Sequence, residues 1–487
     1  MHIVFAASEC APFAATGALA EAVGALPKEL VKLGHRVTVY LPFYPSVKPF
    51  IAGDLLYAVR SLTIPFPTYN RFAGVVDGGE RDGVQFYFID CPELFERDGI
   101  YGPKAWAADY SDNAERFGLF CRAVIEATKQ LGVPEVFHVH DWPAALIPVL
   151  LRTVYFFDPA LRSAATVLTI HSAAYQGWFP PNTVPQLLLP WDLFTFDKLE
   201  QHGALDWLKG GVVYSDYLTA VSPSYAQEIQ TAEFGAGLDP ALAARHGDLR
   251  GVLNGVDYAL WDPARDPKLA AHYSAEHLEG KIDCRRDLLH GFGLHEVPSE
   301  TMIVGMVTRL VTHKGLDFLT EIGDRLLERN VALVVLGAGE PMYEDYLRGL
   351  AARKPNRVGA QMKFDNALAH KIQAGADVLL IPSRYEPCGV NQMYALKYGT
   401  APVVRATGGL KDTVEEWNAE AQNGTGFLFD GYNSADLLAA VDRALAAFAD
   451  KASWQALMRN GMAKSFTWER AAGEYVEVYH EVLRRRG

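Results

Sequence analysis

The chain has 487 residues, 49% of them hydrophobic, and a formal net charge of −13. This length exceeds what one hydrophobic core usually holds and suits two large domains. The acidic balance argues against a nucleic-acid-binding protein, which needs a basic surface. The chain has no uninterrupted apolar run of about 18 residues, so no membrane span is expected.

The N-terminal sequence MHIVFAASEC has no basic region before its apolar run, so it is typical of a first β-strand and not of a signal peptide. The five cysteines are scattered and none forms a Cys-x-x-Cys pair, so neither a disulfide framework nor a zinc site is expected. These features predict a cytoplasmic protein in a reducing compartment.

Short β-branched and aromatic runs alternate with helical stretches along the chain, for example helical patterns at 19–33 and 315–328. The alternation predicts an α/β protein with two Rossmann-like domains, parallel sheets built from βαβ units, and ligands at the carboxyl ends of the strands. The expected strands are residues 2–6, 37–41, 84–90, 136–140, 166–171 and 218–221 in the first half, and 303–308, 331–337, 378–382, 401–405 and 426–429 in the second.

A change in composition marks the expected domain junction. Residues 231–299 are rich in Gly, Pro, Asp and His and have weaker periodicity, so we place the junction near 250–257. The final segment has Trp468, Ala472, Tyr475 and Tyr479 at helical spacing. The sequence therefore predicts an N-terminal domain of residues 1–249 with a closing helix at 467–487, and a C-terminal domain of residues 250–466.

In the first half, three segments carry polar or glycine residues where strands end. The run Ala15-Thr16-Gly17-Ala18-Leu19-Ala20-Glu21 joins the first strand to a helix, whose start could face a phosphate or form only a tight turn. HVHDWPA (138–144) suggests a metal through His138, His140 and Asp141, but a strand-end turn capped by Asp141 explains it better, and no nearby cluster completes a metal site. His171 ends the next strand, and two polar strand ends in one sheet favour a ligand crevice.

In the second half, Arg309 and Lys314 lie in TRLVTHKGLD, where a strand ends and a helix begins. Two cations beside a helix start suit a diphosphate, and a solvated basic pair is the alternative. The chain has no Asp-x-Asp triplet, so these two cations, and not a carboxylate-bound metal, are expected to handle the charge of a leaving group.

The segment PSRYEPCGVNQ (382–392) directly follows an expected strand. Glu386 supplies an acceptor and the backbone at Cys388 and Gly389 supplies donors, the mixture that sugar hydroxyls need. The alternative for Glu386 is a salt bridge to Arg384. After the next strand, Gly408 and Gly409 form a glycine turn, and a phosphate or sugar close to that backbone would explain the missing side chains.

Together these segments resemble the glycogen and starch synthases, glycosyltransferase family 5 of the GT-B fold. The resemblance runs from Met1 to the closing helix. It is carried, in family order and spacing, by SECAPFAATGALAEAVGALP, HVHDW, TIHSAAYQG, TAVSPSYAQEI, VLNGVD, TRLVTHKGLD, SRYEPCGVNQMYALKYGT and TGGLKDTV.

The resemblance implies transfer of glucose from ADP-glucose to the non-reducing end of an α-1,4-glucan, with retention, no metal, and a site in the inter-domain cleft. It leaves a monomer and a homo-oligomer equally open. The implied site residues and their roles are His171 and Asp141 on the donor glucose, Arg309 and Lys314 on the diphosphate, Glu386 with the backbone of Cys388 and Gly389 on glucose hydroxyls, Asn254 near the donor, Phe364 stacked on the base where the family has tyrosine, and Ala15, Thr16, Gly17, Glu21, Gly408 and Gly409 lining the substrate.

Four departures from the family pattern fall on the N-terminal domain. Lys-Thr-Gly-Gly-Leu is replaced by a run in which Ala15 and Ala18 stand for the lysine and the second glycine, Ser172 stands for Asn, and Glu21 stands for Asp. Lys104 or Arg116 could replace the missing cation.

These departures keep other functions open. One alternative is a catalytically weakened homologue that binds glucan or nucleotide, and another is a related retaining transferase using a donor such as UDP-glucose. A nicotinamide oxidoreductase would share the Rossmann geometry, but the Gly-x-Gly-x-x-Gly fingerprint is missing after the first strand.

Overall fold

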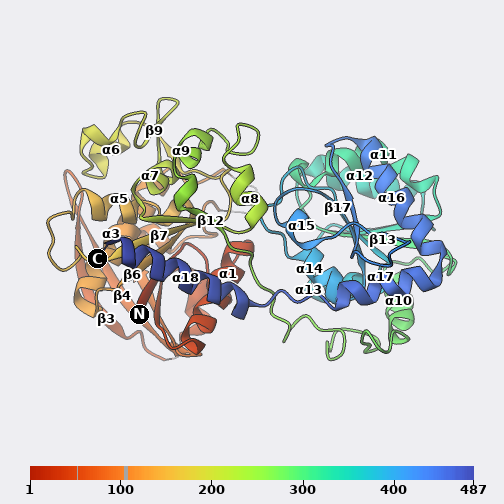
Figure 1. Ribbon diagram of the computed structural model, residues 1–487. Coiled ribbons are helices and arrows are strands. Elements are labelled where there is room, and N and C mark those ends of the chain that lie inside the picture. Colours follow the sequence, from red (N-terminus) through yellow and green to blue (C-terminus); the bar gives the residue numbers. More distant parts are fainter. Residues whose placement is uncertain (52, 104–107, 487) are drawn as a thin grey trace. The chain divides into compact units, whose positions relative to one another are not determined.

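The computed structural model describes residues 1–51, 53–103 and 108–486, and the chain divides into two compact domains (Figure 1). The N-terminal domain holds Met1–Asn254 together with the final helix α18 (Trp468–Arg486), and the C-terminal domain holds Gly255–Thr467. All eleven expected strands are present, each within one residue of its expected ends, and the predicted α/β fold with two Rossmann-like domains is confirmed.

The N-terminal domain is built on a nine-stranded sheet in the order β12-β11-β7-β6-β1-β2-β5-β4-β3. Its strands from β12 to β5 are parallel, and the central ones are fully buried because helices cover both faces. The strands are β1 (His2–Ala6), β2 (Arg36–Pro42), β3 (Tyr57–Pro65), β4 (Asn70–Arg81), β5 (Val84–Asp90), β6 (Val136–His140), β7 (Ala165–Ile170), β11 (Tyr217–Ala220) and β12 (Leu249–Gly251).

One edge of this sheet departs from the parallel arrangement that we expected. β3 and β4 form an antiparallel pair, and β4 is antiparallel to β5. β3 alternates buried and exposed residues, as an edge strand with one wet face does, and such a pattern lacks the apolar run of a buried parallel strand. A second small sheet, β8-β10-β9 (Trp178–Phe179, Ala204–Asp206, Glu200–Gln201), was also not predicted.

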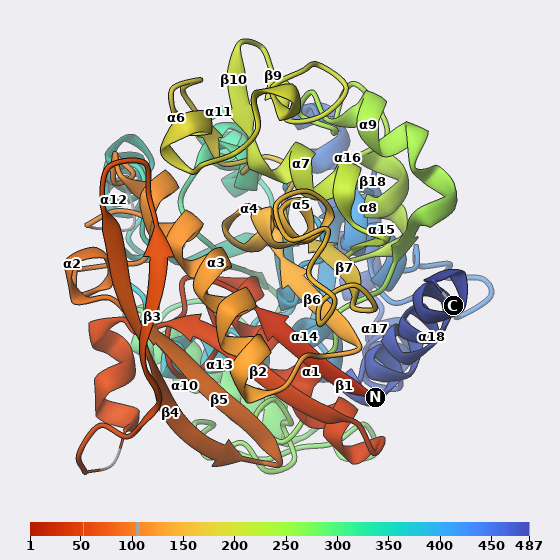
Figure 2. The same ribbon diagram turned by 90° about the vertical axis from the view of Figure 1, so that its left-hand side faces the viewer.

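The helices of the N-terminal domain follow the strands in chain order. They are α1 (Ala18–Lys32), η1 (Pro45–Phe50), α2 (Pro92–Phe95), α3 (Asn113–Leu131), α4 (Asp141–Ala144), α5 (Leu146–Arg152), α6 (Thr183–Gln186), η2 (Trp191–Leu193), α7 (Trp207–Tyr214), α8 (Pro223–Glu228), α9 (Asp239–Ala244) and η3 (His246–Asp248). α18 packs against α1 and β7, so both chain ends lie in this domain (Figure 2).

The C-terminal domain contains a six-stranded sheet, parallel throughout, in the order β15-β14-β13-β16-β17-β18. The chain runs outward from β13 to one edge, then returns to the centre and runs to the other edge. The neighbours β13 and β16 therefore form a topological switch point, where the loops leaving the two strands diverge and a ligand can enter. The strands are β13 (Met302–Val307), β14 (Val331–Leu336), β15 (Val358–Gln361), β16 (Val378–Ile381), β17 (Ala401–Arg405) and β18 (Phe427–Phe429).

Apolar side chains fix both faces of this sheet. One core joins Val304, Val335 and Leu380 to the helices of one face, and a second joins Ile303 and Leu379 to those of the other. The helices are α10 (Gly280–Gly291), η4 (Thr312–Lys314), α11 (Leu316–Leu327), α12 (Pro341–Arg353), α13 (Asn366–Gly375), α14 (Asn391–Lys397), α15 (Gly408–Thr413), α16 (Ser434–Ala449) and α17 (Lys451–Met462). Among the helices of the described ranges, none is long and apolar enough to cross a membrane.

Candidate active site

The switch point of the C-terminal domain brings together two predicted site residues that are 72 positions apart. Lys314 ends η4, in the loop after β13, and Glu386 lies in the loop after β16. Lys314 Nζ lies 2.6 Å from Glu386 Oε2, and Ser383 Oγ donates to the same oxygen at 2.9 Å. Both partners of this ion pair are largely buried, with side-chain exposures of 16% and 12%.

This geometry shifts the pKa values of Glu386 and of the neighbouring His313. Burial opposes ionisation of Glu386, but the charge and hydrogen bond of Lys314, with the bond from Ser383, hold the pKa of its carboxyl below the ordinary value. Burial, reinforced by the charges of Lys314 and Arg309, lowers the pKa of His313 to about 4. At neutral pH the site therefore has an ionised Glu386 beside a neutral His313.

The alternative interpretations of Glu386 and of the Arg309 and Lys314 cations are wrong. Glu386 pairs with Lys314 and not with Arg384, whose guanidinium lies 5.6 Å from the centre of the Tyr432 ring. Arg309 and Lys314 do not form a solvated basic pair, because Lys314 is held by Glu386 while only Arg309 is exposed.

Glycines allow these loops to approach each other. A Cβ on Gly315 would lie 2.4 Å from the carbonyl oxygen of Pro382, and its φ of 82° also favours glycine. A Cβ on Gly408 or Gly409 would lie 2.0 Å from the carbonyl oxygen of Glu386 or of Cys388, respectively. The missing side chains at 408 and 409 therefore have a cause within the protein, and the ligand that we invoked from sequence is not needed to explain them.

The backbone of the glycine turn also holds the Glu386 loop. Gly409 N donates to the carbonyl oxygen of Glu386 at 3.1 Å. Cys388 is 3% exposed, and Gly389 has a φ of 67°. At the start of α14, Asn391 Nδ2 donates to the carbonyl oxygen of Val307 at 2.9 Å, which joins this loop to the end of β13.

In the N-terminal domain, polar residues gather at the carboxyl ends of β6 and β7. His140 Nδ1 lies 3.0 Å from His171 Nε2, and Asp141 Oδ1 accepts from His171 N at 2.7 Å and from Ser172 N at 3.4 Å. Burial raises the pKa of Asp141 to about 7, although the two backbone N–H groups oppose the rise. His138 hydrogen-bonds Thr169 and Tyr479, so both of its ring nitrogens have partners within the protein.

The loop after β1 is anchored by a residue that the sequence analysis missed. Glu9, 3% exposed, accepts from Thr16 Oγ1 at 2.9 Å and from Tyr101 Oη at 2.6 Å. The signal was present in SECAPFAATG, where an acidic residue follows an apolar strand. The segment from Ala15 to Ala18 is exposed, and a Cβ on Gly17 would meet no atom within 4 Å.

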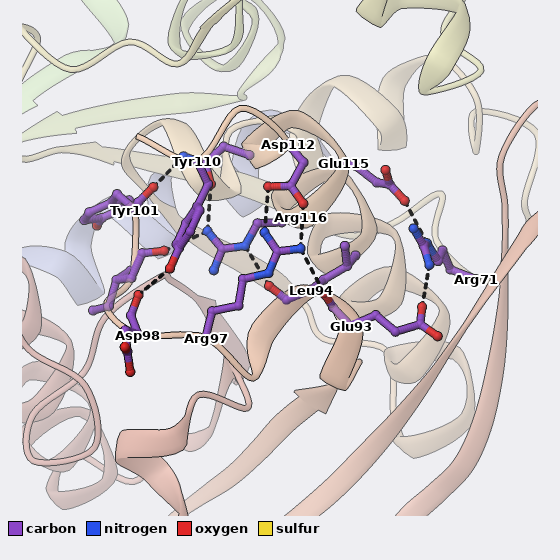
Figure 3. A network of polar contacts seen from close by, with 12 residues as sticks. Arg71, Glu93, Leu94, Arg97, Asp98, Tyr101, Tyr110, Asp112, Glu115 and Arg116 are labelled. Carbon is purple, nitrogen blue, oxygen red and sulfur yellow. Dashed lines mark hydrogen bonds and ion pairs between the residues drawn. The ribbon is translucent and has the colours of Figure 1, made fainter. Parts of the chain in front are cut away.

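Arg116 does not replace the lysine that the family pattern places at Ala15. Its side chain is 0% exposed and donates to the carbonyl oxygens of Leu94 at 2.7 Å and Ile100 at 2.8 Å, under the Tyr110 ring (Figure 3). A guanidinium held by carbonyl groups in a core cannot reach an exposed loop. Lys104, the other candidate, lies outside the described residues.

The remaining predicted residues occupy different environments. Asn254 is buried at the end of the N-terminal domain, whereas Phe364 is 89% exposed in the C-terminal domain. Glu21 is exposed in the first turn of α1. Within the described part of the chain, no three His, Cys, Asp or Glu side chains are grouped as a metal site.

The chain matches known glycosyltransferases over nearly its whole length. Residues 2–244 match the starch synthase catalytic domain, and residues 294–455 match glycosyl transferases group 1. The glycogen synthase of Koribacter versatilis is 53% identical over 486 residues, which cover 100% of this chain and 99% of that protein. The glycogen synthase of Geobacillus stearothermophilus is 41% identical over 487 residues, which cover 100% and 98%.

Solved structures agree with these matches. The catalytic domain of starch synthase IV from Arabidopsis thaliana, bound to ADP and acarbose, aligns with a TM-score of 0.89 and 32% identity over 99% of each chain. Sucrose-phosphate synthase from Thermosynechococcus elongatus, at 16% identity and a TM-score of 0.61 over the full length of both chains, shares the fold alone. The two α/β domains and these matches define a glycosyltransferase of the GT-B fold. Within that class, the chain belongs to the glycogen and starch synthase family.

Proposed function

We propose that the protein transfers glucose from ADP-glucose to the non-reducing end of an α-1,4-glucan, with retention of configuration. In this proposal the domain of residues 250–466 binds the nucleotide sugar, and the domain of residues 1–249 with 467–487 serves the acceptor. The Lys314–Glu386 pair at the switch point of the C-terminal sheet is the observation that carries the proposal.

The ion pair offers both a hydrogen-bond acceptor and hydrogen-bond donors from a fixed position. Glu386 Oε2 is occupied by Lys314 and Ser383, and Oε1 has no hydrogen bond to another described residue, which leaves it to accept from glucose hydroxyls. Lys314 uses one of its three donors on Glu386 and keeps two for the diphosphate. Arg309, exposed after β13, adds positive charge, and Phe364 presents a ring on which a base can stack.

The positive charge of Lys314 and Arg309 would stabilise the leaving ADP without a metal ion. Attack on the same face of the sugar, assisted by the leaving diphosphate, needs no protein nucleophile. In the N-terminal domain we assign contact with the donor glucose to His171 and Asp141. The residues that line the rest of the substrate site are Ala15, Thr16, Gly17, Glu21 and Asn254.

The decisive experiment is incorporation of labelled glucose into glycogen from ADP-glucose and UDP-glucose in parallel, each with and without EDTA. We expect incorporation from ADP-glucose that persists in EDTA. Incorporation from UDP-glucose alone would reassign the donor, and complete loss in EDTA that magnesium restores would sink the metal-free mechanism.

A specific observation favours the second candidate, a weakened homologue. Ala15 lies in an exposed loop and Ala18 is the exposed first residue of α1, where the family has a lysine and a glycine, and Arg116 is too buried to compensate. A positioned cation is worth on the order of 10²–10³ in rate. If the loss slows the enzyme, Ala15→Lys with Ala18→Gly raises turnover with ADP-glucose by at least about tenfold. A double variant that is slower than the native protein would show that the loop is adapted to other contacts.

A further inference from the structure

A pair of buried histidines joins the ends of β6 and β7. His140 is 1% exposed, and its Nδ1 lies 3.0 Å from His171 Nε2. The His140 ring stacks on Phe5 at 5.3 Å between ring centres and contacts the His138 ring, tilted by 34°, at 4.3 Å. Packing on both sides therefore fixes the His140 ring, and through it the position of the His171 ring.

The protonation of the His140 and His171 rings follows from their burial. Burial lowers the pKa of His171 to about 3 and the pKa of His140 well below its ordinary value, so both rings are neutral at pH 7. A neutral imidazole has one N–H donor and one acceptor nitrogen. Because one proton lies between His140 Nδ1 and His171 Nε2, the two outer nitrogens have opposite roles, one donor and one acceptor.

Those outer nitrogens, His140 Nε2 and His171 Nδ1, are both buried and have no hydrogen-bond partner among the described residues. An unsatisfied buried polar atom is costly, so such atoms call for a partner. His171 Nδ1 belongs to the residue that we assign to the donor sugar, whose hydroxyls can act as donor or acceptor.

The neighbouring histidine does not have this freedom. Within the described residues, the Tyr479 hydroxyl has His138 Nδ1 as its hydrogen-bond partner, at 2.8 Å. The hydroxyl satisfies its proton by donating to Nδ1, so His138 carries its own proton on Nε2 and donates to Thr169 Oγ1 at 2.6 Å. His138 is thus held in one tautomer, and the pair of His140 and His171 remains adjustable.

We propose that His140 is a positioning residue for His171. It holds His171 Nε2 and fixes the ring, and its own tautomer sets the role of His171 Nδ1. When His140 carries its proton on Nδ1, His171 Nδ1 donates to a sugar hydroxyl, and when His140 carries its proton on Nε2, His171 Nδ1 accepts. No atom of His140 contacts substrate in this scheme. The inference rests on the proposed role of His171 in sugar binding.

The first test compares two substitutions of nearly equal shape. His140→Leu removes the hydrogen bond, whereas His140→Asn places an amide that can donate or accept where Nδ1 lies. We expect His140→Leu to lower kcat about 10- to 100-fold, and His140→Asn to recover kcat to within about threefold of the native enzyme. The affinity for ADP should stay within about twofold in both, because the Lys314–Glu386 pair lies in the other domain.

A double-mutant cycle separates positioning from structural support. If His140 acts through His171, then His140→Leu combined with His171→Leu is no slower than His171→Leu alone. Losses that multiply would overturn the inference, as would equal kcat values for His140→Asn and His140→Leu. A His171→Leu variant with native kcat would instead refute the assigned role of His171, and the inference with it.

A direct measurement covers the case in which His140→Leu does not fold. In native protein with ¹⁵N-labelled histidine, NMR at pH 7 should show one protonated nitrogen on each of the two rings and a coupling across the Nδ1···Nε2 hydrogen bond. Lack of that coupling, or a doubly protonated ring, would overturn the inference.

Discussion

At the scale of single residues, the buried ion pair of Lys314 and Glu386 serves orientation more than stability. Removing two charges from water costs several kcal/mol, and their attraction in a protein interior roughly offsets that cost. In the function that we propose, the pair provides an acceptor oxygen and two N–H donors that need no rearrangement when charge develops on a leaving group.

Glu386→Gln keeps the shape of the side chain and removes its charge. Lys314 would then be a buried cation without its counter-ion, and the strong acceptor that we propose for sugar hydroxyls would be lost. We expect turnover to fall by about 10²–10³ while ADP still binds, measured by single-turnover kinetics and calorimetry. Arg384→Gln is the matched control, because Arg384 lies beside Tyr432 and does not pair with Glu386; it should stay within about threefold of native. Similar losses in both variants would contradict the pairing.

A second residue prediction concerns pH. The folded pKa of Asp141, about 7, lies above the ordinary value of 3.8, so the folded state binds this proton more tightly than the unfolded chain does. The contribution of Asp141 to stability is therefore fully present below pH 4 and is lost as the pH rises through 7. Asp141→Asn removes the titration, keeps the acceptor for His171 N, and tolerates the φ of 53° at this position.

Relative to the native protein, Asp141→Asn should therefore gain about 2–3 kcal/mol in the free energy of unfolding of the N-terminal domain between pH 5 and pH 8. Urea unfolding at the two pH values measures the gain. The same pH dependence in both proteins would show that Asp141 is ionised in the fold at pH 5.

At the scale of elements, the glycine pair that begins α15 supports the loop that carries Glu386. A Cβ on Gly409 would lie 2.0 Å from the carbonyl oxygen and 2.6 Å from the carbonyl carbon of Cys388, so the backbone itself must move. Gly409→Ala should destabilise the C-terminal domain by about 1–3 kcal/mol. It should also lower turnover, because the loop that carries Glu386 is displaced. Gly291→Ala is the control, since a Cβ there meets nothing within 4 Å. Thermal unfolding and turnover are measured for both variants. A Gly409→Ala protein with native stability and turnover would show that the loop can move aside without cost.

The sequence predicts elements well where local pattern and tertiary environment agree. β6, β13 and β14 are short apolar runs buried in a parallel sheet, and their bounds follow from composition. β3 and β4 were missed because an antiparallel edge needs only weak alternation and a turn. Its existence depends on pairing with β5, which a local pattern does not encode.

The site shows the same division. That Lys314 and Glu386 belong to strand-end loops was visible in the sequence, and the switch point then places those loops together. Which cation holds Glu386 was not visible, because Arg384 is two residues away and Lys314 is 72 away. For the same reason Glu9 was missed and His140 was considered only as a possible metal ligand, since their partners Tyr101 and His171 lie 92 and 31 positions along the chain.

At the scale of the whole molecule, the N-terminal domain is made from two distant pieces of chain. α18 returns after the C-terminal domain and packs on α1 and β7, burying Trp468, Tyr475, Val478, Tyr479 and Val482. Its Tyr479 hydroxyl bonds His138, next to the histidine pair at the ends of β6 and β7. The last residues of the chain are therefore part of the support of the candidate site.

Truncation after residue 467 tests this dependence. Burial of the five large side chains of α18, at about 1.5–3 kcal/mol each, is comparable to the total stability of about 5–15 kcal/mol that domains usually have. We therefore expect the truncated protein to lose the calorimetric unfolding transition of its N-terminal domain. The transition of the C-terminal domain, identified by its shift with ADP, should remain.

Tyr479→Phe is the graded version of the same experiment. It keeps the ring packing of α18 and removes only the hydroxyl, so His138 Nδ1 is left buried without a donor. That loss should lower the stability of the N-terminal domain by about 1–3 kcal/mol and leave the ADP-dependent transition unchanged. If Tyr479→Phe instead lowers both transitions together, the two domains unfold as one cooperative unit, and α18 supports the whole chain and not the N-terminal domain alone.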